Sequence, residues 1–297
     1  MRGDEDALVT ALKGKRIAVV GAGGTGCQVI PILSRLKADL IIIDRDVVEE
    51  GNVARQILYK KQDVGAPKAI IAAKQFGQEG FFEDLNHKNI NELLKGADFI
   101  FDCTDNIETR LLINDYCIKN RIPWVHTSAS QHTGEVLMVT GTPCYRCVLG
   151  EKHGETCDSD VMMGALRGTA AIAVAITANY FATGAIEDEL VRASAKEQTV
   201  MKFIVKPDPN CPACHGKYEY LDGKRAPSRL CGSGRFMIDL EKEIDLGKAA
   251  GNLTGIRAKT ASAIITDKFT IMKNGRVIVK AESEKGAKKL LNNILLA

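Results

Sequence analysis

The sequence has no marked excess of charge and no long apolar run, and we expect no secretory leader. Its net charge is only +3, from 40 basic and 37 acidic residues, so charge gives no reason to expect binding to nucleic acid or to a membrane. The longest apolar stretch, 168–181, is short for a membrane span and rich in Ala and Gly. The N-terminus is charged, and no signal peptide is expected. We therefore expect a cytoplasmic protein without membrane or nucleic-acid partners, in which 168–181 is a closely packed helix of the core or of a dimer interface.

Nine cysteines in a chain of this kind indicate reduced thiols, a metal site or catalysis rather than a disulfide framework. Four of them form two Cys-x-x-Cys pairs, Cys144-Tyr-Arg-Cys147 and Cys211-Pro-Ala-Cys214. Two such pairs are typical of a tetrahedral zinc site with four thiolates, which is structural because no coordination position stays open. The pairs are farther apart than the ligands of a zinc finger, so we predict a clasp between distant segments. Redox pairs or unreactive buried cysteines are the alternative.

Most of the other cysteines and histidines receive no chemical role. His215 adjoins one cysteine pair, but the neighbour of a ligand is more often exposed. The histidines without ligand spacing are His87, His126, His132 and His153. The cysteines interpreted as packing residues are Cys27, Cys103, Cys117 and Cys231.

A glycine-rich turn follows the first predicted strand, 16–20. The glycines of this turn are Gly21, Gly23, Gly24 and Gly26. They let the backbone amides at the start of the next predicted helix, 24–36, point at an anion. The second strand, 40–43, ends at Asp44, which is placed to accept hydrogen bonds from a ribose. The turn by itself is a weak signal that indicates only a dinucleotide or a nucleotide phosphate.

Alternating strands and helices continue along the chain. The predicted segments are a helix at 67–75 that begins with Pro67, a strand at 97–102, a helix at 107–119 and strands at 124–128 and 135–139. This order predicts a doubly wound, mostly parallel, Rossmann-like α/β sheet whose ligand site lies outside the carboxyl ends of the strands. Asp44, Asp105 and the glycine turn all fall at those ends.

We expect the chain to divide into a nucleotide-binding domain with the zinc clasp at 1–218 and a small α+β domain at 219–297. In the second part, Asn274-Gly275 between apolar runs at 269–272 and 276–279 is a strong hairpin signal. Residues 283–296 predict an amphipathic helix. This domain serves either stability and dimerisation or docking of a partner protein, and the sequence does not choose between them.

Polar residues beyond Asp44 indicate which nucleotide is bound. Asn52, Arg55, Gln56 and Lys68 add amides, a guanidinium and an ammonium group, which suit a triphosphate and have no use in binding a nicotinamide dinucleotide. Asp105 is a hard oxygen ligand suited to Mg²⁺. A single exposed Arg or Lys usually faces solvent, and Asp105, next to Asn106, can instead cap the helix that begins near Ile107.

The segments 44–56, 64–68 and 102–106, together with the cysteine pairs, resemble the ubiquitin-activating-enzyme-like family that includes ThiF, MoeB and HesA. The resemblance covers about residues 14–218. It implies an ATP- and Mg²⁺-dependent adenylyltransferase that acts on the C-terminal carboxylate of a ubiquitin-like β-grasp protein ending in Gly-Gly, often a sulfur carrier. It also implies release of pyrophosphate and a homodimer. It does not identify the partner or the pathway.

The resemblance assigns roles residue by residue. The residues implied to be catalytic are Arg55, Lys68, Asp105 and Cys157. Those implied to bind the nucleotide are Gly21, Gly23, Gly24, Gly26, Asp44, Asp46, Asn52, Arg55, Gln56, Lys68, Asp105 and Asn106. Cys157 stands where some members carry a cysteine that forms a thioester or an acyl disulfide; Lys152 and Arg167 favour its thiolate, whereas Asp158 and Asp160 oppose it.

The chain departs from the family at its N-terminus. Many members have an arginine there that completes the ATP site of the neighbouring subunit, and Arg2 is the sole candidate here. This departure supports a scaffold that binds nucleotide or partner without catalysis. An enzyme that adenylates a modified tRNA base is a further alternative, against which the cysteine pairs count. An NAD-dependent dehydrogenase would leave the polar residues beyond Asp44 unexplained.

Overall fold

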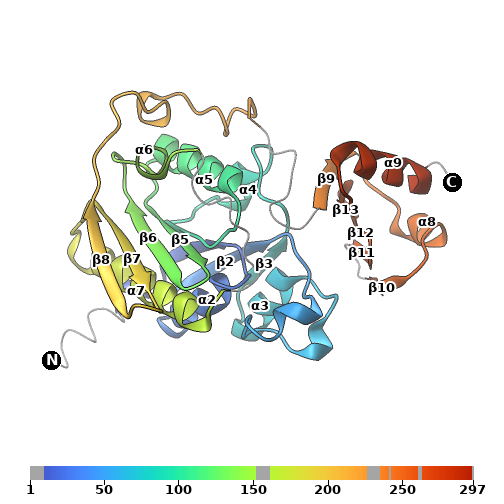
Figure 1. The fold of residues 1–297 in the computed structure, drawn as a ribbon, viewed down its shortest axis with the longest axis horizontal. Coiled ribbons are helices and arrows are strands. Elements are labelled where there is room, and N and C mark those ends of the chain that lie inside the picture. The colour runs from blue at the N-terminus through green and yellow to red at the C-terminus, as the bar shows by residue number, and fades with distance from the viewer. Residues whose placement is uncertain (1–9, 152–160, 226–234, 241, 260–262, 296–297) are drawn as a thin grey trace. The chain divides into compact units, whose positions relative to one another are not determined.

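The computed structural model describes residues 10–151, 161–225, 235–240, 242–259 and 263–295 of the chain (Figure 1). The chain divides into two compact units, Met1–Ala226 and Pro227–Ala297. Tyr220 and Leu221, which come after the expected domain boundary at residue 218, pack in the core of the first unit. Each unit has a sheet of its own, with eight strands in the first and five in the second.

The large sheet is doubly wound, and its strand order is β3-β2-β1-β4-β5-β6-β7-β8. The strands are β1 (Arg16–Val20), β2 (Asp39–Asp44), β3 (Glu79–Phe82), β4 (Phe99–Asp102), β5 (Trp124–Ser130), β6 (Thr133–Val139), β7 (Glu189–Ser194) and β8 (Thr199–Ile204). Strands β1 to β5 are mutually parallel, and β6, β7 and β8 join antiparallel. The predicted architecture is confirmed. The winding reverses between β1 and β4, which is where sheets of this class bind ligands.

Helices cover both faces of the large sheet (Figure 1). The helices on one face are α2 (Gly26–Arg35), α3 (Lys68–Phe76) and α7 (Met163–Thr183), and those on the other are α4 (Ile90–Leu93), α5 (Ile107–Asn120) and α6 (Tyr145–Leu149). Strand β1 is buried on both sides because Ile17 and Val19 pack in the first layer, and Ala18 and Val20 in the second.

The predicted helices are present, but two of them begin later than predicted: α2 begins at Gly26 instead of residue 24, and α3 begins after Pro67. Pro67 lies outside that helix as its N-cap residue, so the helix begins one residue later than predicted. The apolar stretch 168–181 lies inside α7 and contributes Ala170, Ala173 and Ala178 to the core. None of the helices in the described ranges is long and apolar enough to cross a membrane.

The second unit is a small α+β fold, as predicted. Its sheet order is β10-β11-β12-β13-β9. The elements are β9 (Arg235–Asp239), α8 (Leu246–Gly251), β10 (Ile256–Lys259), β11 (Ala263–Thr266), β12 (Phe269–Met272), β13 (Arg276–Lys280) and α9 (Glu284–Leu295). The hairpin around Asn274-Gly275 is confirmed, and Ala287 and Leu291 of α9 pack on the sheet core with Ile271 and Val277.

The glycine turn after β1 admits no side chain at two of its positions. Gly21 has φ +96°, and a Cβ there would lie 2.5 Å from the carbonyl oxygen of Cys103. At Gly26 a Cβ would lie 1.9 Å from the carbonyl oxygen of Gly21. The first turn of α2 therefore packs directly on the backbone of the preceding strand end.

We expect Gly26→Ala to lower the free energy of unfolding by about 2–3 kcal/mol, because backbone rather than a movable side chain must give way. Gly168→Ala is the matched control: no atom lies within 4 Å of its added Cβ. An Ala inside a helix should raise stability by up to about 1 kcal/mol. The midpoints of urea unfolding measure both changes in stability, provided that the slope of unfolding free energy against urea concentration is the same for each variant. Equal midpoints for the two variants would contradict the close approach.

Candidate functional site

The backbone of Ala22 in the glycine turn is held by hydrogen bonds at both its N–H and its carbonyl. Its N–H donates to Asp44 Oδ2 at 2.6 Å, and its carbonyl accepts from the Tyr59 hydroxyl at 2.6 Å and from the Cys27 thiol at 3.3 Å. Asp44 Oδ1 accepts from the N–H of Asp46 at 2.6 Å. Burial raises the pKa of Asp44 from 3.8 to about 6, although the charge of Lys68 opposes the rise. The acidic residue at the end of β2 thus shapes the turn itself.

Lys68 brings a buried cation to the same edge. Its N–H donates to the carbonyl of Asp46 at 3.0 Å, and a β-bridge joins Val47 to Pro67, so the start of α3 is fixed against the end of β2. The Nζ atom lies 3.4 Å from Asp46 Oδ2. Burial alone lowers the pKa of Lys68, but the carboxylates of Asp46 and Asp44 outweigh it and raise the net value. The ammonium group is therefore charged at neutral pH.

The amides and the guanidinium group beyond β2 lie on a short 3₁₀ helix, η1 (Glu50–Asn52), and the turn after it. Asn52 is buried, and its Oδ1 accepts from the N–H of Glu49 at 3.3 Å. Arg55 is half-buried and donates to the carbonyl of Gly51 at 3.3 Å. Gln56 is buried, and its Oε1 finds no hydrogen-bond partner among the described residues. A donor supplied by a ligand would satisfy that oxygen.

Gln56 also reaches the glycine turn directly. A Cβ added at Gly23 would lie 3.9 Å from Gln56 Nε2, whereas a Cβ at Gly24 would lie 3.1 Å from Leu166 on α7. The turn is therefore enclosed by an amide on one side and an apolar side chain on the other. Because Gly23 and Gly24 have no side chain, a bound group can approach the backbone of the turn closely.

Asp105 and Asn106 follow β4, and the structure separates their roles. Asp105 is exposed (69% of its side chain), and its Oδ1 lies 3.9 Å from Arg45 Nη2. Asn106 is the N-cap of α5 and accepts from the N–H of Thr109 at 2.8 Å. The capping role that the sequence allowed for Asp105 is thus taken by Asn106. A nucleotide contact of Asn106 stays a prediction.

Arg45 is a residue of this edge that the sequence interpretation missed. It lies between Asp44 and Asp46 after β2, pairs with Asp84 at 3.0 Å and reaches Asp105 from there. Because β2 and β4 flank β1, the contact to Asp105 spans the end of β1, where the glycine turn begins. Its position between two acidic residues was the available signal.

The sequence interpretation also missed a group of side chains around Asp102, three residues before Asp105. The fully buried Asp102 at the end of β4 has its Oδ2 atom 2.8 Å from His126 Nδ1 and 3.6 Å from Arg110 Nε. Burial lowers the pKa of His126 and is the largest effect; together with the charge of Arg110 it outweighs the hydrogen bond and the charge of Asp102, which raise the pKa. The imidazole is therefore neutral and donates from Nδ1. His126 had received no role because it shows no ligand spacing.

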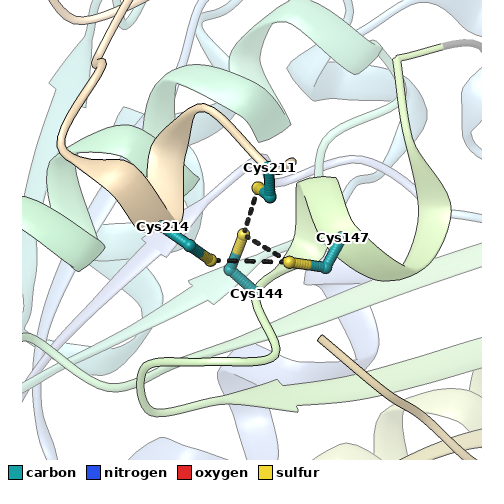
Figure 2. A group of neighbouring side chains, drawn as sticks. All are labelled: Cys144, Cys147, Cys211 and Cys214. Atoms are coloured by element: carbon teal, nitrogen blue, oxygen red, sulfur yellow. Dashed lines mark hydrogen bonds between the residues drawn. The ribbon is translucent and has the colours of Figure 1, made fainter. Parts of the chain in front are cut away.

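The four cysteines of the two pairs converge, as Figure 2 shows. Their sulfur atoms all lie within 4.8 Å of one another, with Cys144–Cys211 at 3.6 Å and Cys147–Cys214 at 3.4 Å. Four ligands at the usual Zn–S distance place their sulfurs roughly 3.8 Å apart, so the arrangement fits a tetrahedral ion. Cys144 precedes α6, and Cys214 lies in the 3₁₀ helix η3 (Ala213–His215). The predicted clasp between distant segments is confirmed.

Side chains around the cluster fix its shape. Asn114 of α5 donates to Cys144 Sγ at 3.6 Å and accepts from the N–H of Tyr145 at 3.0 Å. His215 is exposed, and its Nε2 lies 2.7 Å from the carbonyl oxygen of Pro209, so it stands outside the cluster as expected. The packing cysteines that the structure describes are buried: Cys27, Cys103 and Cys117.

Several residues of the sequence analysis lie outside the described residues. They are Arg2, Cys157 and Cys231, and the same holds for Lys152, His153, Asp158 and Asp160, which were named beside Cys157 or among the histidines. The interpretation of each stays a prediction. Among the described residues, Arg146 lies between Cys144 and Cys147 and forms an ion pair with Glu219 at 2.6 Å. This ion pair ties the first cysteine pair to the segment after the second.

Known proteins share both sequence and fold with this chain. The profile of the ThiF family matches residues 4–213. The SAMP-activating enzyme E1 of Haloferax volcanii is 32% identical over 219 residues, which is 68% of this chain and 81% of that protein. The sulfur carrier protein ThiS adenylyltransferase of Bacillus subtilis is 28% identical over 302 residues, 92% of this chain and 90% of that protein. The crystal structure of E. coli MccB with ATP has a TM-score of 0.60 at 18% identity, over 70% of this chain and 69% of that one, and so shares the fold.

The raised pKa of Asp44 generates a prediction about stability. In the folded protein Asp44 binds its proton near pH 6, but in the unfolded chain only near pH 3.8. The folded state is therefore favoured as the pH falls from 7 to 4, by an amount of the order of 2 kcal/mol. Asp44→Asn removes this titration. We expect the wild type to gain unfolding free energy relative to Asp44→Asn over that pH range, measured by urea unfolding, and a relative loss would contradict the burial argument.

Proposed function

The chain belongs to the ThiF family, and on this premise we propose that it is an ATP-dependent adenylyltransferase acting on the C-terminal carboxylate of a ubiquitin-like or sulfur-carrier protein. The observation that carries the proposal is the edge at which Asp44 holds the glycine turn beside the buried, charged Lys68. The names of the relatives support it, because one activates SAMP and another adenylylates the sulfur carrier ThiS.

The proposed reaction forms an acyl adenylate. A carboxylate oxygen of the partner attacks the α-phosphorus of ATP, the bond from that phosphorus to the bridging oxygen breaks, and pyrophosphate leaves. Two anions meet and a third departs, so positioning and positive charge should supply most of the catalysis. Lys68 and Arg55 would hold the β- and γ-phosphates, and the amides of the glycine turn face the remaining phosphate oxygens.

Other residues would bind and orient the nucleotide. Asp44 accepts hydrogen bonds from the ribose, and Asn52 and Gln56 add neutral amides close to the turn. Asp46, the partner of Lys68 in the described structure, keeps that cation at the edge. Asp105 would hold Mg²⁺, which neutralises phosphate charge when bound; its exposed carboxylate oxygens are hard ligands of the right kind.

The partner is proposed to be a β-grasp protein that ends in Gly-Gly, because a tail without side chains can reach a phosphate next to the glycine turn. We further propose a homodimer in the cytoplasm, supported by the small side chains along α7, which allow a second helix to approach closely. Cys157 is proposed to take part only after adenylation, as the acceptor of the acyl group.

Zinc is the proposed occupant of the four-cysteine cluster. We expect about one zinc per chain, and loss of zinc together with lower stability in Cys211→Ser, because three thiolates cannot complete the tetrahedron. Elemental analysis of the purified protein measures the metal. Cys117→Ser is the control, since this buried cysteine lies outside the cluster and its substitution should release no metal. A metal-free protein after careful reconstitution would refute the assignment.

The adenylation step is tested by exchange of labelled pyrophosphate into ATP. Exchange should appear only when a Gly-Gly carrier protein is added. Asp105→Asn should lower it at least about a hundredfold, because the Mg²⁺ ligand is lost. Cys157→Ala should leave it intact, because attack on ATP precedes any thiol chemistry.

Two outcomes would change the conclusion. Exchange lost in a folded Cys157→Ala protein would show that the two steps are not separate. Absence of exchange with every Gly-Gly carrier of the same genome, while ATP still raises the melting temperature, would favour the scaffold. NAD should not raise the melting temperature at matched concentration.

A further inference from the structure

The loop that carries Asp105 is held at the residue before it. Asp102 Oδ1 accepts both the N–H of Thr104, at 3.0 Å, and its hydroxyl, at 2.6 Å. The carbonyl oxygen of Thr104 accepts from Arg110 Nη2 at 2.6 Å. All three polar groups of Thr104 are thus bonded to side chains that come from outside the loop. On the other side of Asp105, Asn106 is fixed as the cap of α5.

Arg110 makes this arrangement possible from the second turn of α5. It is 4% exposed and makes two different contacts, a hydrogen bond to Thr104 and an ion pair with the buried Asp102. A guanidinium group can do both because its nitrogens form a rigid fork. A lysine at this position would keep the charge but could not contact the Thr104 carbonyl and the Asp102 carboxylate in the same way.

Asp105 depends on this support more than a buried residue would. Its side chain is 69% exposed, and its Oδ1 lies 3.9 Å from Arg45 Nη2. Packing holds an exposed carboxylate only weakly, so the fixed backbone on either side of Asp105 contributes to its position. A metal ligand that already has its binding position loses less conformational entropy when the ion binds.

We propose that Arg110 is a positioning residue that fixes the Thr104 carbonyl and so places Asp105 for Mg²⁺. This inference rests on the proposed function, in which Asp105 is the Mg²⁺ ligand. Arg110 itself contacts neither nucleotide nor metal in this account. It acts through the loop.

Calorimetric titration of the full chain with ATP, at a series of Mg²⁺ concentrations, tests the proposal without measuring turnover. We expect Arg110→Lys to raise the Mg²⁺ concentration for half-maximal ATP binding roughly tenfold, while ATP affinity at saturating Mg²⁺ changes little. Arg16→Lys is the matched control. Arg16 pairs with Asp39 and Glu79 at the opposite end of the sheet, so its loss affects stability but not the Mg²⁺ requirement.

A double-mutant cycle gives the decisive comparison. Asp105→Asn alone should raise the Mg²⁺ requirement, and adding Arg110→Lys should then raise it less than twofold further. If Arg110→Lys keeps its full effect without Asp105, or leaves the Mg²⁺ requirement of a folded protein unchanged, the positioning role is wrong. Should Arg110→Lys not fold, Thr104→Val removes the hydroxyl contact to Asp102 and must shift the Mg²⁺ requirement in the same direction.

The wild type separates this inference from the proposed function. Wild-type protein that binds ATP with a Mg²⁺ requirement, beside an Arg110→Lys variant with the same requirement, overturns the positioning role alone. Wild-type protein that binds no ATP at any Mg²⁺ concentration overturns the proposed function, and the inference with it.

Discussion

Lys68 enters the core at the start of α3, and its ammonium group keeps its charge there because Asp46 lies 3.4 Å away and Asp44 adds a second negative charge. Without those carboxylates, burial would favour the neutral amine, and the edge of the sheet would lose its cation. The carboxylate of Asp44 also accepts the N–H groups of Ala22 and Asp46, so the group that helps to keep Lys68 charged also fixes the glycine turn and the end of β2. The shape of this edge of the sheet and its positive charge thus have one origin.

Helix α5 connects this edge to the cysteine cluster on the same layer of the molecule. Its first residues follow the Asn106 cap, its second turn carries Arg110, and one turn later Asn114 contacts Cys144. A change that releases the cysteine clasp therefore removes a contact from the helix that supports Asp105. Cys144 of the cluster thus contacts the same helix whose N-cap follows Asp105.

Local patterns were enough to predict much of the fold. The strand before Gly21, the acid at Asp44 and the hairpin at Asn274-Gly275 are each encoded within a few residues, because glycine geometry and strand periodicity are local properties. The convergence of the cysteine pairs was predictable because a tetrahedral ion requires it. Helix α4 was missed because its four residues are too few to show a period, and β8 was missed because all six of its residues are exposed and therefore show no alternation.

Residues that act through tertiary contacts were not predictable in the same way. Arg110 and His126 meet at Asp102 only because β4, β5 and α5 pack together, and no spacing in the chain reports that meeting. Whether Asp105 or Asn106 caps α5 was not predictable for a related reason. Either residue suits an N-cap, and the choice depends on which backbone is extended at the start of α5.

The edge containing Asp44 and Lys68 is proposed to activate a protein carboxylate with ATP, and mass spectrometry of the partner tests this activity most directly. A Gly-Gly carrier incubated with the protein, ATP and Mg²⁺, and quenched in acid within one turnover, should gain the mass of one AMP at its C-terminal residue. A carrier lacking its last glycine should gain nothing. An intact carrier of unchanged mass, in the presence of protein that has bound ATP, would contradict the account.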